Sequence, residues 1–140
     1  MPKESEFWQV DVRRLRAFGE IDRLEDALKK GTSDCVYGLR CKGVVGFGWV
    51  ELKRLTYWPR SVIRLPKFTI DQVNFLERWG RAGVGAWLLT QVNTEYFLFH
   101  WNNVRDVQSG LRRNEFVARA SVHGHDKFPA GRILRCLTNT

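Results

Sequence analysis

One amphipathic helix with strand-like runs on both sides constrains the fold of this 140-residue chain more than any other feature. Residues 69–82, "TIDQVNFLERWGRA", have helical spacing, and Thr69 followed by Gln72 matches a capping box, which satisfies backbone N–H groups at a helix start. The buried stripe of this helix is expected to contain Ile70, Val73, Leu76 and Trp79.

Short runs rich in β-branched and aromatic residues lie before and after this helix. They are "DCVYGL" (34–39), "GWVELKRL" (48–55), "VGAWLLTQV" (84–92) and "YFLFHW" (96–101). Alternation in the last run is expected to bury Phe97, Phe99 and Trp101. Strands interrupted by a helix predict an α/β fold with a mixed central β-sheet flanked by helices.

The N-terminal residues are less clearly patterned. Residues 5–18 predict an amphipathic helix, with Ser5 as its N-cap. Residues 20–30 are compatible either with a helix that ends at Gly31 or with a strand.

The C-terminal part, residues 102–140, is expected to be more irregular, apart from a helical segment in "PAGRILRCL" (129–137). We predict a single domain over residues 1–140, because this length is enough to bury one core. Its core is expected to cover about residues 5–101, and residues 102–140 to form a basic C-terminal extension.

The net charge of the chain is +8, its pI is about 9.9, and the positive excess is unevenly placed. Residues 1–30 hold seven acidic and seven basic residues, so the whole excess lies after residue 30. Such a pI with clustered arginines is typical of nucleic-acid binders, although a basic surface without a dedicated partner has the same composition. The candidate phosphate contacts are Arg105, Arg112, Arg113, Arg119, Arg132 and Arg135.

No apolar run approaches the roughly 20 residues that span a bilayer, and the N-terminus lacks the pattern of a signal peptide. We therefore expect a soluble, cytoplasmic protein without a membrane partner, and its three cysteines to be reduced. Cys35 and Cys41 with His123 and His125 offer zinc ligands, but they lack the short spacing that indicates a zinc site. "HGH" (123–125) is interpreted as a polar turn.

One glutamate, Glu51, lies in a basic stretch. Between Asp34 and Asp71 it is the only acidic residue, whereas seven Lys or Arg lie there. On a strand, Trp49, Glu51 and Lys53 share one face. Glu51 and Lys53 therefore form either an ordinary surface ion pair or part of a metal-dependent active site, in which Trp49 is placed to stack on a base.

Antiparallel pairing through the glycine-rich turn after "DCVYGL" is expected to bring Asp34 close to Glu51. Two converging carboxylates repel each other, and a divalent cation removes that repulsion. Mg²⁺ favours one or two carboxylates together with water and phosphate oxygens. Lys53 is then placed to orient or help deprotonate an attacking water, or to neutralise charge at the phosphorus.

These residues resemble the PD-(D/E)XK nuclease superfamily, and more narrowly the phage-type nucleases related to VRR-Nuc and Holliday-junction resolvases. "GTSD" ending at Asp34, "WVELK" (49–53) and "KFTIDQ" (67–72) match the family's G-x-P-D turn, W-I-E-L-K strand and F-T-x-x-Q helix start. The resemblance covers about residues 5–101, and Ser33 departs from it by replacing the proline before Asp34. It implies a restriction-endonuclease-like αβββαβ core.

The resemblance also implies roles for individual residues. Asp34 and Glu51 would bind the catalytic Mg²⁺ (or Mn²⁺), helped by the backbone carbonyl of Leu52, and Lys53 would be the catalytic lysine. Gln72 would match the family's helix glutamine near the active site, although its position in a capping box explains it equally well.

Family members also place a glutamate of the first helix at the metal site. Glu6 is our candidate, and Glu25 is the second candidate if its segment is a strand. An exposed glutamate in a first helical turn is also a favourable partner of the helix dipole, so Glu6 has a second explanation.

As a whole, the resemblance implies an Mg-dependent endodeoxyribonuclease that hydrolyses phosphodiester bonds, with selectivity for branched, Holliday-junction-like DNA. It also implies a homodimer, located in the cytoplasm of a host cell if the chain is phage-encoded. A non-catalytic nucleic-acid-binding module that retains the nuclease fold is the alternative, but such a module has no need for acidic residues that repel phosphate. A third class, a protein-binding accessory factor, predicts negligible affinity for DNA at physiological salt.

Overall fold

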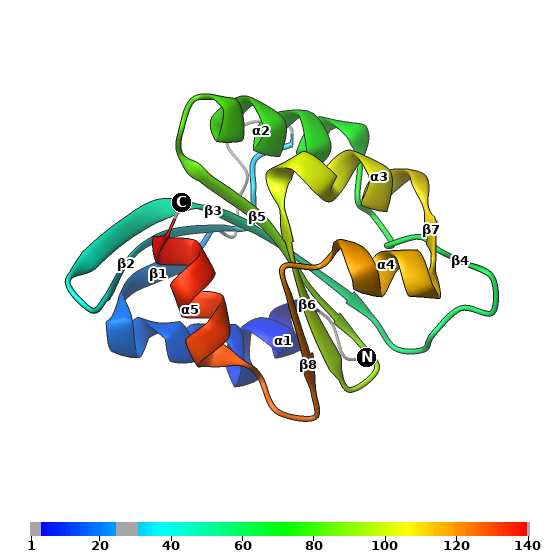
Figure 1. The fold of residues 1–140 in the computed structure, drawn as a ribbon, viewed down its shortest axis with the longest axis horizontal. Coiled ribbons are helices and arrows are strands. Elements are labelled where there is room, and N and C mark those ends of the chain that lie inside the picture. The colour runs from blue at the N-terminus through cyan, green and yellow to red at the C-terminus, as the bar shows by residue number, and fades with distance from the viewer. Residues whose placement is uncertain (1–3, 25–30, 140) are drawn as a thin grey trace.

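The computed structural model describes residues 4–24 and 31–139 and has a six-stranded sheet at its centre (Figure 1). In spatial order, its strands are β1 (Gly19–Arg23), β2 (Cys35–Cys41), β3 (Val44–Leu55), β5 (Gly85–Val92), β6 (Glu95–His100) and β8 (Val122–His125). Neighbouring strands are antiparallel except β3 and β5, which are parallel. A small second sheet pairs β4 (Val62–Ile63) with β7 (Leu111–Arg112).

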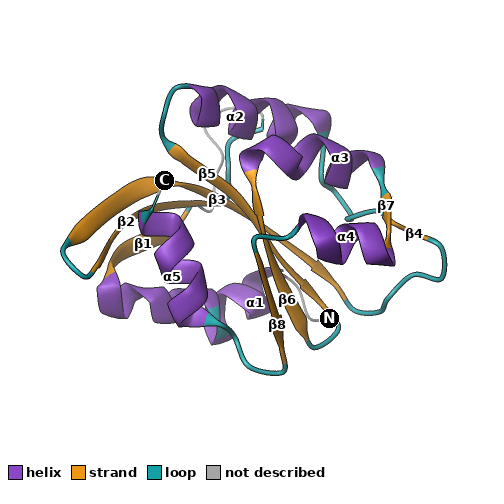
Figure 2. Ribbon diagram, in the orientation of Figure 1, coloured by secondary structure: helices purple, strands orange, loops and turns teal. Residues whose placement is uncertain are grey.

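Helices cover both faces of the main sheet. They are α1 (Glu4–Val10), α2 (Ile70–Arg81), α3 (Val104–Ser109), α4 (Arg113–Arg119) and α5 (Ala130–Thr138), with two 3₁₀ helices, η1 (Val12–Phe18) and η2 (Trp101–Asn103). Figure 2 shows α2, α3 and α4 on one side of the sheet and α1 and α5 on the other. The prediction of an α/β fold with a mixed central sheet flanked by helices is therefore confirmed. Among the described residues, no helix has the length and apolar character needed to cross a membrane.

The β2–β3 hairpin contains Glu51 and Lys53 and begins directly after Asp34. Its turn consists of Lys42 and Gly43, whose φ angles of 52° and 81° are left-handed. This two-residue geometry matches the right-handed twist of the flanking strands, so the turn fixes the register of the hairpin. The hairpin extends beyond the helices at the left edge of the molecule (Figure 2).

The helix predicted over 69–82 is α2, and its capping box is confirmed. The prediction of its buried stripe was partly wrong, because Ile70 and Trp79 are 46% and 37% exposed. Phe75 and Gly80 are buried instead. The Gly80 side of the helix packs against Trp101 of η2. The contact is so close that a Cβ on Gly80 would lie only 2.3 Å from the Trp101 ring.

The N-terminal segment predicted as one helix divides into α1 and η1, and residues 19–23 form a strand. In the run predicted to be strand over 96–101, Phe97 and Phe99 are buried as expected. Trp101 instead begins η2 and is half-buried, so its predicted burial was wrong.

The residues after 101 are part of the fold instead of an irregular extension. They supply α3, α4, β8 and α5, and both hydrophobic cores contain them. Phe116 of α4 lies in the core under α2, and Leu137 of α5 lies in the core on the opposite face. "HGH" is a strand, β8, rather than the predicted polar turn, because it pairs with β6 along the sheet edge.

Candidate functional site

Asp34 and Glu51 meet where β2 begins beside β3. Cys35 pairs with Val50, so the antiparallel register places Asp34 opposite Glu51. The Asp34 carboxylate continues the ladder by accepting a hydrogen bond from Leu52 N–H at 2.9 Å, and Asp34 C=O accepts one from Leu24 N–H at 2.7 Å. The side chain of Asp34 is therefore held beside β3 and its main chain beside the end of β1.

The Glu51 carboxylate is fully buried and incompletely satisfied. Its Oε1 lies 3.5 Å from Ser33 Oγ, the outer limit for a hydrogen bond, and its Oε2 accepts none from any described residue. Burial raises the pKa of Glu51 well above its usual value, and the charge of Asp34 raises it further, whereas Lys53 lowers it.

Lys53 faces the same carboxylate. Its Nζ lies 3.2 Å from Glu51 Oε2 and donates a hydrogen bond to the carbonyl of Lys67 at 2.9 Å. The Lys53 side chain is only 3% exposed, so Glu51 and Lys53 do not form a surface ion pair. With Asp34, which is half-buried, the cluster contains two acidic groups and one basic group, of which Glu51 and Lys53 lie away from bulk water.

The start of α2 lies beside this cluster. Gly31 has a φ of +85°, and a Cβ there would lie 2.6 Å from the carbonyl oxygen of Asp71, so only glycine allows the loop before Asp34 to approach α2 so closely. The neighbouring Gln72 uses its amide oxygen to accept a hydrogen bond from Thr69 N–H at 3.0 Å. Its backbone N–H donates to Thr69 Oγ1, so the contacts of Gln72 are those of a cap.

The structure does not bring Glu6 to the carboxylate pair. Glu6 Oε1 forms an ion pair with Arg54 Nη1 at 3.0 Å, and its side chain is 57% exposed. Arg54 follows Lys53 on β3 and therefore points to the opposite face of the sheet. Leu52 is also buried on that opposite face, which leaves only its main chain beside Asp34. The second candidate, Glu25, lies outside the described residues.

Two carboxylates with an unsatisfied oxygen are suited to a hard divalent cation. Mg²⁺ and Mn²⁺ prefer oxygen ligands, and Asp34 and Glu51 supply them side by side. A bound cation would give Glu51 Oε2 a second partner beside Lys53 Nζ and compensate the second negative charge. The residues present therefore fit the predicted metal, although Lys53 already compensates one charge.

The aromatic and arginine side chains have mainly structural contacts. Trp49 is half-buried and packs on Phe75 and Trp79, with ring centroids 5.0 and 5.7 Å away, so packing explains it without a nucleic-acid base. Four of the candidate phosphate contacts are already bonded within the protein: Arg105 to Glu77, Arg113 to Glu95, Arg119 to Asp106 and Arg132 to the carbonyl of His123.

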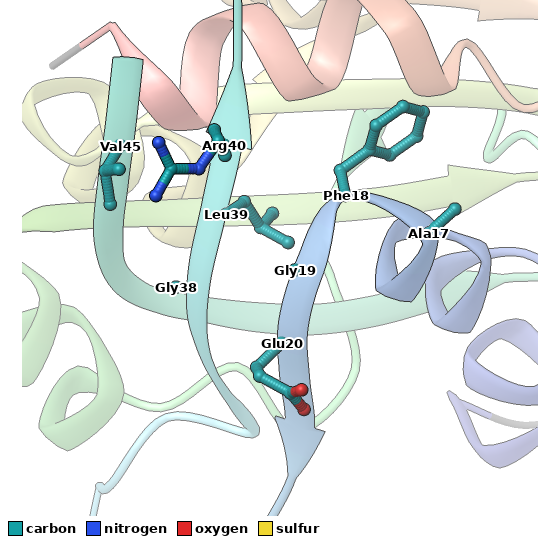
Figure 3. A pocket seen from close by; sticks show the side chains of 8 residues that line it. All are labelled: Ala17, Phe18, Gly19, Glu20, Gly38, Leu39, Arg40 and Val45. Carbon is teal, nitrogen blue, oxygen red and sulfur yellow. The ribbon is translucent and has the colours of Figure 1, made fainter. Parts of the chain in front are cut away.

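Of the open hollows that the described residues line away from the carboxylate pair, two are larger than the third. One, of about 430 Å³, lies at the far end of β2 from Asp34 and has Glu20 and Arg40 as its only charged residues (Figure 3). The other, of about 730 Å³, is basic and is lined by Arg60, Ser61, Arg112, Arg113, Asn114 and Val117. The basic hollow is the surface better suited to a phosphate backbone.

A second cluster, which the sequence analysis missed, consists of Glu95, His123 and His125. One ligand atom from each lies within 4.8 Å of the others. The alternation in "HGH" could have indicated it, because residues two apart on a strand share a face. Of the zinc ligands considered from the sequence, His123 and His125 belong to this cluster, whereas Cys35 lies in the core on the opposite face.

Comparison with protein-family models and with curated proteins finds no match to this chain.

Proposed function

We propose that this protein is a metal-dependent endonuclease that hydrolyses phosphodiester bonds of DNA. The observation that carries the proposal is the Glu51 carboxylate, fully buried beside Asp34 with one oxygen lacking a hydrogen bond. Burying the Glu51 carboxylate beside the half-buried Asp34 is costly even with Lys53 in contact, and a divalent cation would offset that cost. A buried, incompletely compensated carboxylate is a feature of functional sites.

The order of the elements supports a restriction-endonuclease-like core. Apart from η1 and the two-residue β4, which belongs to the small second sheet, the chain from α1 to β5 runs through a helix, three antiparallel strands, a helix and a strand parallel to the third. This is the αβββαβ order that the resemblance implies. Asp34 and Glu51 lie at the start of the second strand and within the third strand of that order.

In this proposal, Asp34, Glu51 and the backbone carbonyl of Leu52 hold Mg²⁺ or Mn²⁺. The bound ion would polarise the phosphate and activate the attacking water. Lys53 contributes a fixed positive charge, because its Nζ is held between the Lys67 carbonyl and Glu51 before any substrate arrives. An ammonium held in this way stabilises the negative charge that develops on the phosphate oxygens as the bond from phosphorus to the leaving oxygen breaks.

The homodimer and the branched substrate belong to the same proposal. Exposed apolar side chains on the β2–β3 hairpin support an interface there, since Val44, Val45 and Phe47 are 52%, 55% and 63% exposed. Sedimentation of the wild-type chain and of Phe47→Asp tests this, because a dimer that uses the hairpin should become monomeric in the variant. The +8 charge and the basic hollow support a polyanionic partner.

The decisive test is cleavage of labelled four-way-junction, duplex and single-stranded DNA with Mg²⁺ or Mn²⁺. Glu51→Gln keeps the shape of the side chain and removes its charge, and should lower the rate by at least about 100-fold. Glu20→Gln, at an exposed glutamate of β1, is the matched control and should cut at the wild-type rate. Tight DNA binding without metal-dependent cleavage by the wild type would favour the non-catalytic binding module.

A further inference from the structure

The cluster of Glu95, His123 and His125 is separate from the Asp34–Glu51 pair. Glu95 pairs with His125 across β6 and β8, and through β5 it lies level with Leu55 of β3. Glu51 is therefore two strands and four residues away from Glu95, a distance of roughly 16 Å at ordinary sheet spacings. One ion cannot bridge the two groups.

We propose that Glu95, His123 and His125 bind a divalent transition-metal ion of the Zn²⁺ class. Two imidazole nitrogens and one carboxylate oxygen form a set that zinc uses, with a fourth position left for water. His123 Nε2 and His125 Nδ1 lie 2.8 and 3.8 Å from Glu95 Oε1. Ligand atoms at 2.0–2.1 Å around a tetrahedral ion are about 3.3 Å apart, so the two observed distances lie on either side of the required one.

Contacts around the cluster orient the ligands. Trp58 Nε1–H donates to Glu95 Oε2 at 2.9 Å, which leaves Oε1 facing the histidines. The His123 ring stacks on Phe97, with ring centroids 4.4 Å apart. Outer contacts of this kind fix the orientation of metal ligands in other sites. The His125 side chain is 67% exposed, so an ion can reach the cluster from solvent.

Arg113 is the one described positive group that contacts the cluster from α4. Its guanidinium stacks on Trp58 at 4.0 Å and lies 3.3 Å from Glu95 Oε2. It therefore occupies the oxygen that the proposed ion does not use, while its charge weakens the affinity for a cation. The ion would join β8 to β6, which pair over only four residue pairs at the edge of the sheet.

The test titrates Zn²⁺, and Co²⁺ as a spectroscopic substitute, into the full chain after treatment with a chelator. Calorimetry should find one Zn²⁺ site per chain, and the visible spectrum of Co²⁺ should report tetrahedral nitrogen and oxygen ligands. His125→Ala, at an exposed position, should weaken binding at least about 100-fold. Trp58→Phe, which removes the indole N–H donor together with part of the ring, should weaken it by about 10–100-fold.

Two control variants make the outcome specific. His100→Asn changes the remaining histidine, the half-buried N-cap of η2, and Asp34→Asn alters the other carboxylate pair. Both variants should bind Zn²⁺ as the wild type does. The proposal is overturned if the wild type shows no saturable site. It is equally overturned if His125→Ala leaves the affinity unchanged or if Asp34→Asn abolishes binding. DNA cleavage is not a readout, so this test is independent of the proposed nuclease.

Discussion

Glu51 and Glu95 lie on the same face of one sheet but in opposite electrostatic surroundings. Burial raises the pKa of Glu51, Asp34 adds to the effect, and Lys53 only partly opposes it. Burial also acts to raise the pKa of Glu95, but hydrogen bonds from His123 and Trp58 reverse the effect, so its pKa is lowered. The number of partners, more than burial, therefore decides the charge state of each carboxylate.

The two glutamates therefore have opposite effects on the stability of the metal-free fold. Glu95 has donors on both oxygens and stabilises the fold as it stands. Glu51 has an oxygen without a hydrogen bond from the described residues and a neighbouring carboxylate, so it weakens the metal-free fold. A residue that is unfavourable for the fold by itself is a better indication of function than one whose contacts are complete.

The largest expected effect comes from removing the positive charge of Lys53 beside Glu51. Lys53→Met leaves the buried Glu51 and the half-buried Asp34 without that charge and should reduce the free energy of unfolding by about 3–5 kcal/mol in chelator. Urea denaturation measures this, and Lys67→Met, at an exposed neighbouring side chain, should change little. Adding Glu51→Gln to Lys53→Met should restore part of the loss. Equal stability of the single and double variants would show that Glu51 is not the group that Lys53 compensates.

Substitution of Glu95 is expected to reduce the free energy of unfolding at neutral pH but not in acid. Glu95→Gln removes charge-assisted hydrogen bonds and should cost about 1.5–3 kcal/mol at pH 7. Because the folded-state pKa of Glu95 is lowered, its contribution is present above the unfolded pKa and is lost as pH falls through the folded pKa. Denaturation of wild type and variant between pH 3 and 7 should therefore converge at low pH.

At Glu51, the pH dependence should have the opposite sign. Its folded-state pKa is raised, so the metal-free fold loses stability as pH rises from the unfolded value toward the folded value. Glu51→Gln should consequently gain stability over wild type as pH increases, by about 1–3 kcal/mol, the penalty of an unsatisfied polar group. A variant that is less stable than wild type at pH 8 in chelator would contradict the contrast between the two glutamates.

The smallest expected effect on stability is at Glu6, an exposed glutamate with which Glu51 and Glu95 can be compared. Its ion pair with Arg54 is largely in solvent, so Glu6→Gln should change stability by only about 0.2–1 kcal/mol. Cleavage by this variant also tests the predicted metal ligand. A rate loss as large as that of Glu51→Gln would mean that Glu6 moves to the metal site when metal and DNA bind.

Local sequence signals were sufficient for the hairpin and for α2. Both the turn at Lys42 and Gly43 and the capping box at Thr69 depend on residues that are close in sequence. Their formation could therefore be predicted. Alternation likewise placed Trp49 on one face of β3 and Val50 on the other, as the two cores confirm. The burial of Glu51 could not be predicted from local sequence signals, because it depends on how α2 and the loop before it cover β3.

Apart from α5, which the sequence predicted as the helical segment 129–137, the C-terminal third carried too little periodicity to be predicted. β8 has four residues, α3 has six and α4 has seven, and each is shorter than the window in which a hydrophobic repeat can be recognised. The cluster at Glu95 depends on pairing between residues about thirty positions apart. The same long-range packing turned α2 so that Trp79 faces outward, against its helical pattern.

The two-residue turn between β2 and β3 also has a consequence for how the protein folds. Because this hairpin closes through a short loop, Asp34 and Glu51 should meet early, whereas the parallel β3–β5 pairing must wait for the longer crossover through α2. Lys67, which holds Lys53, lies in that crossover. We expect the carboxylates to come together while still hydrated and to lose their water only in the last stage of folding.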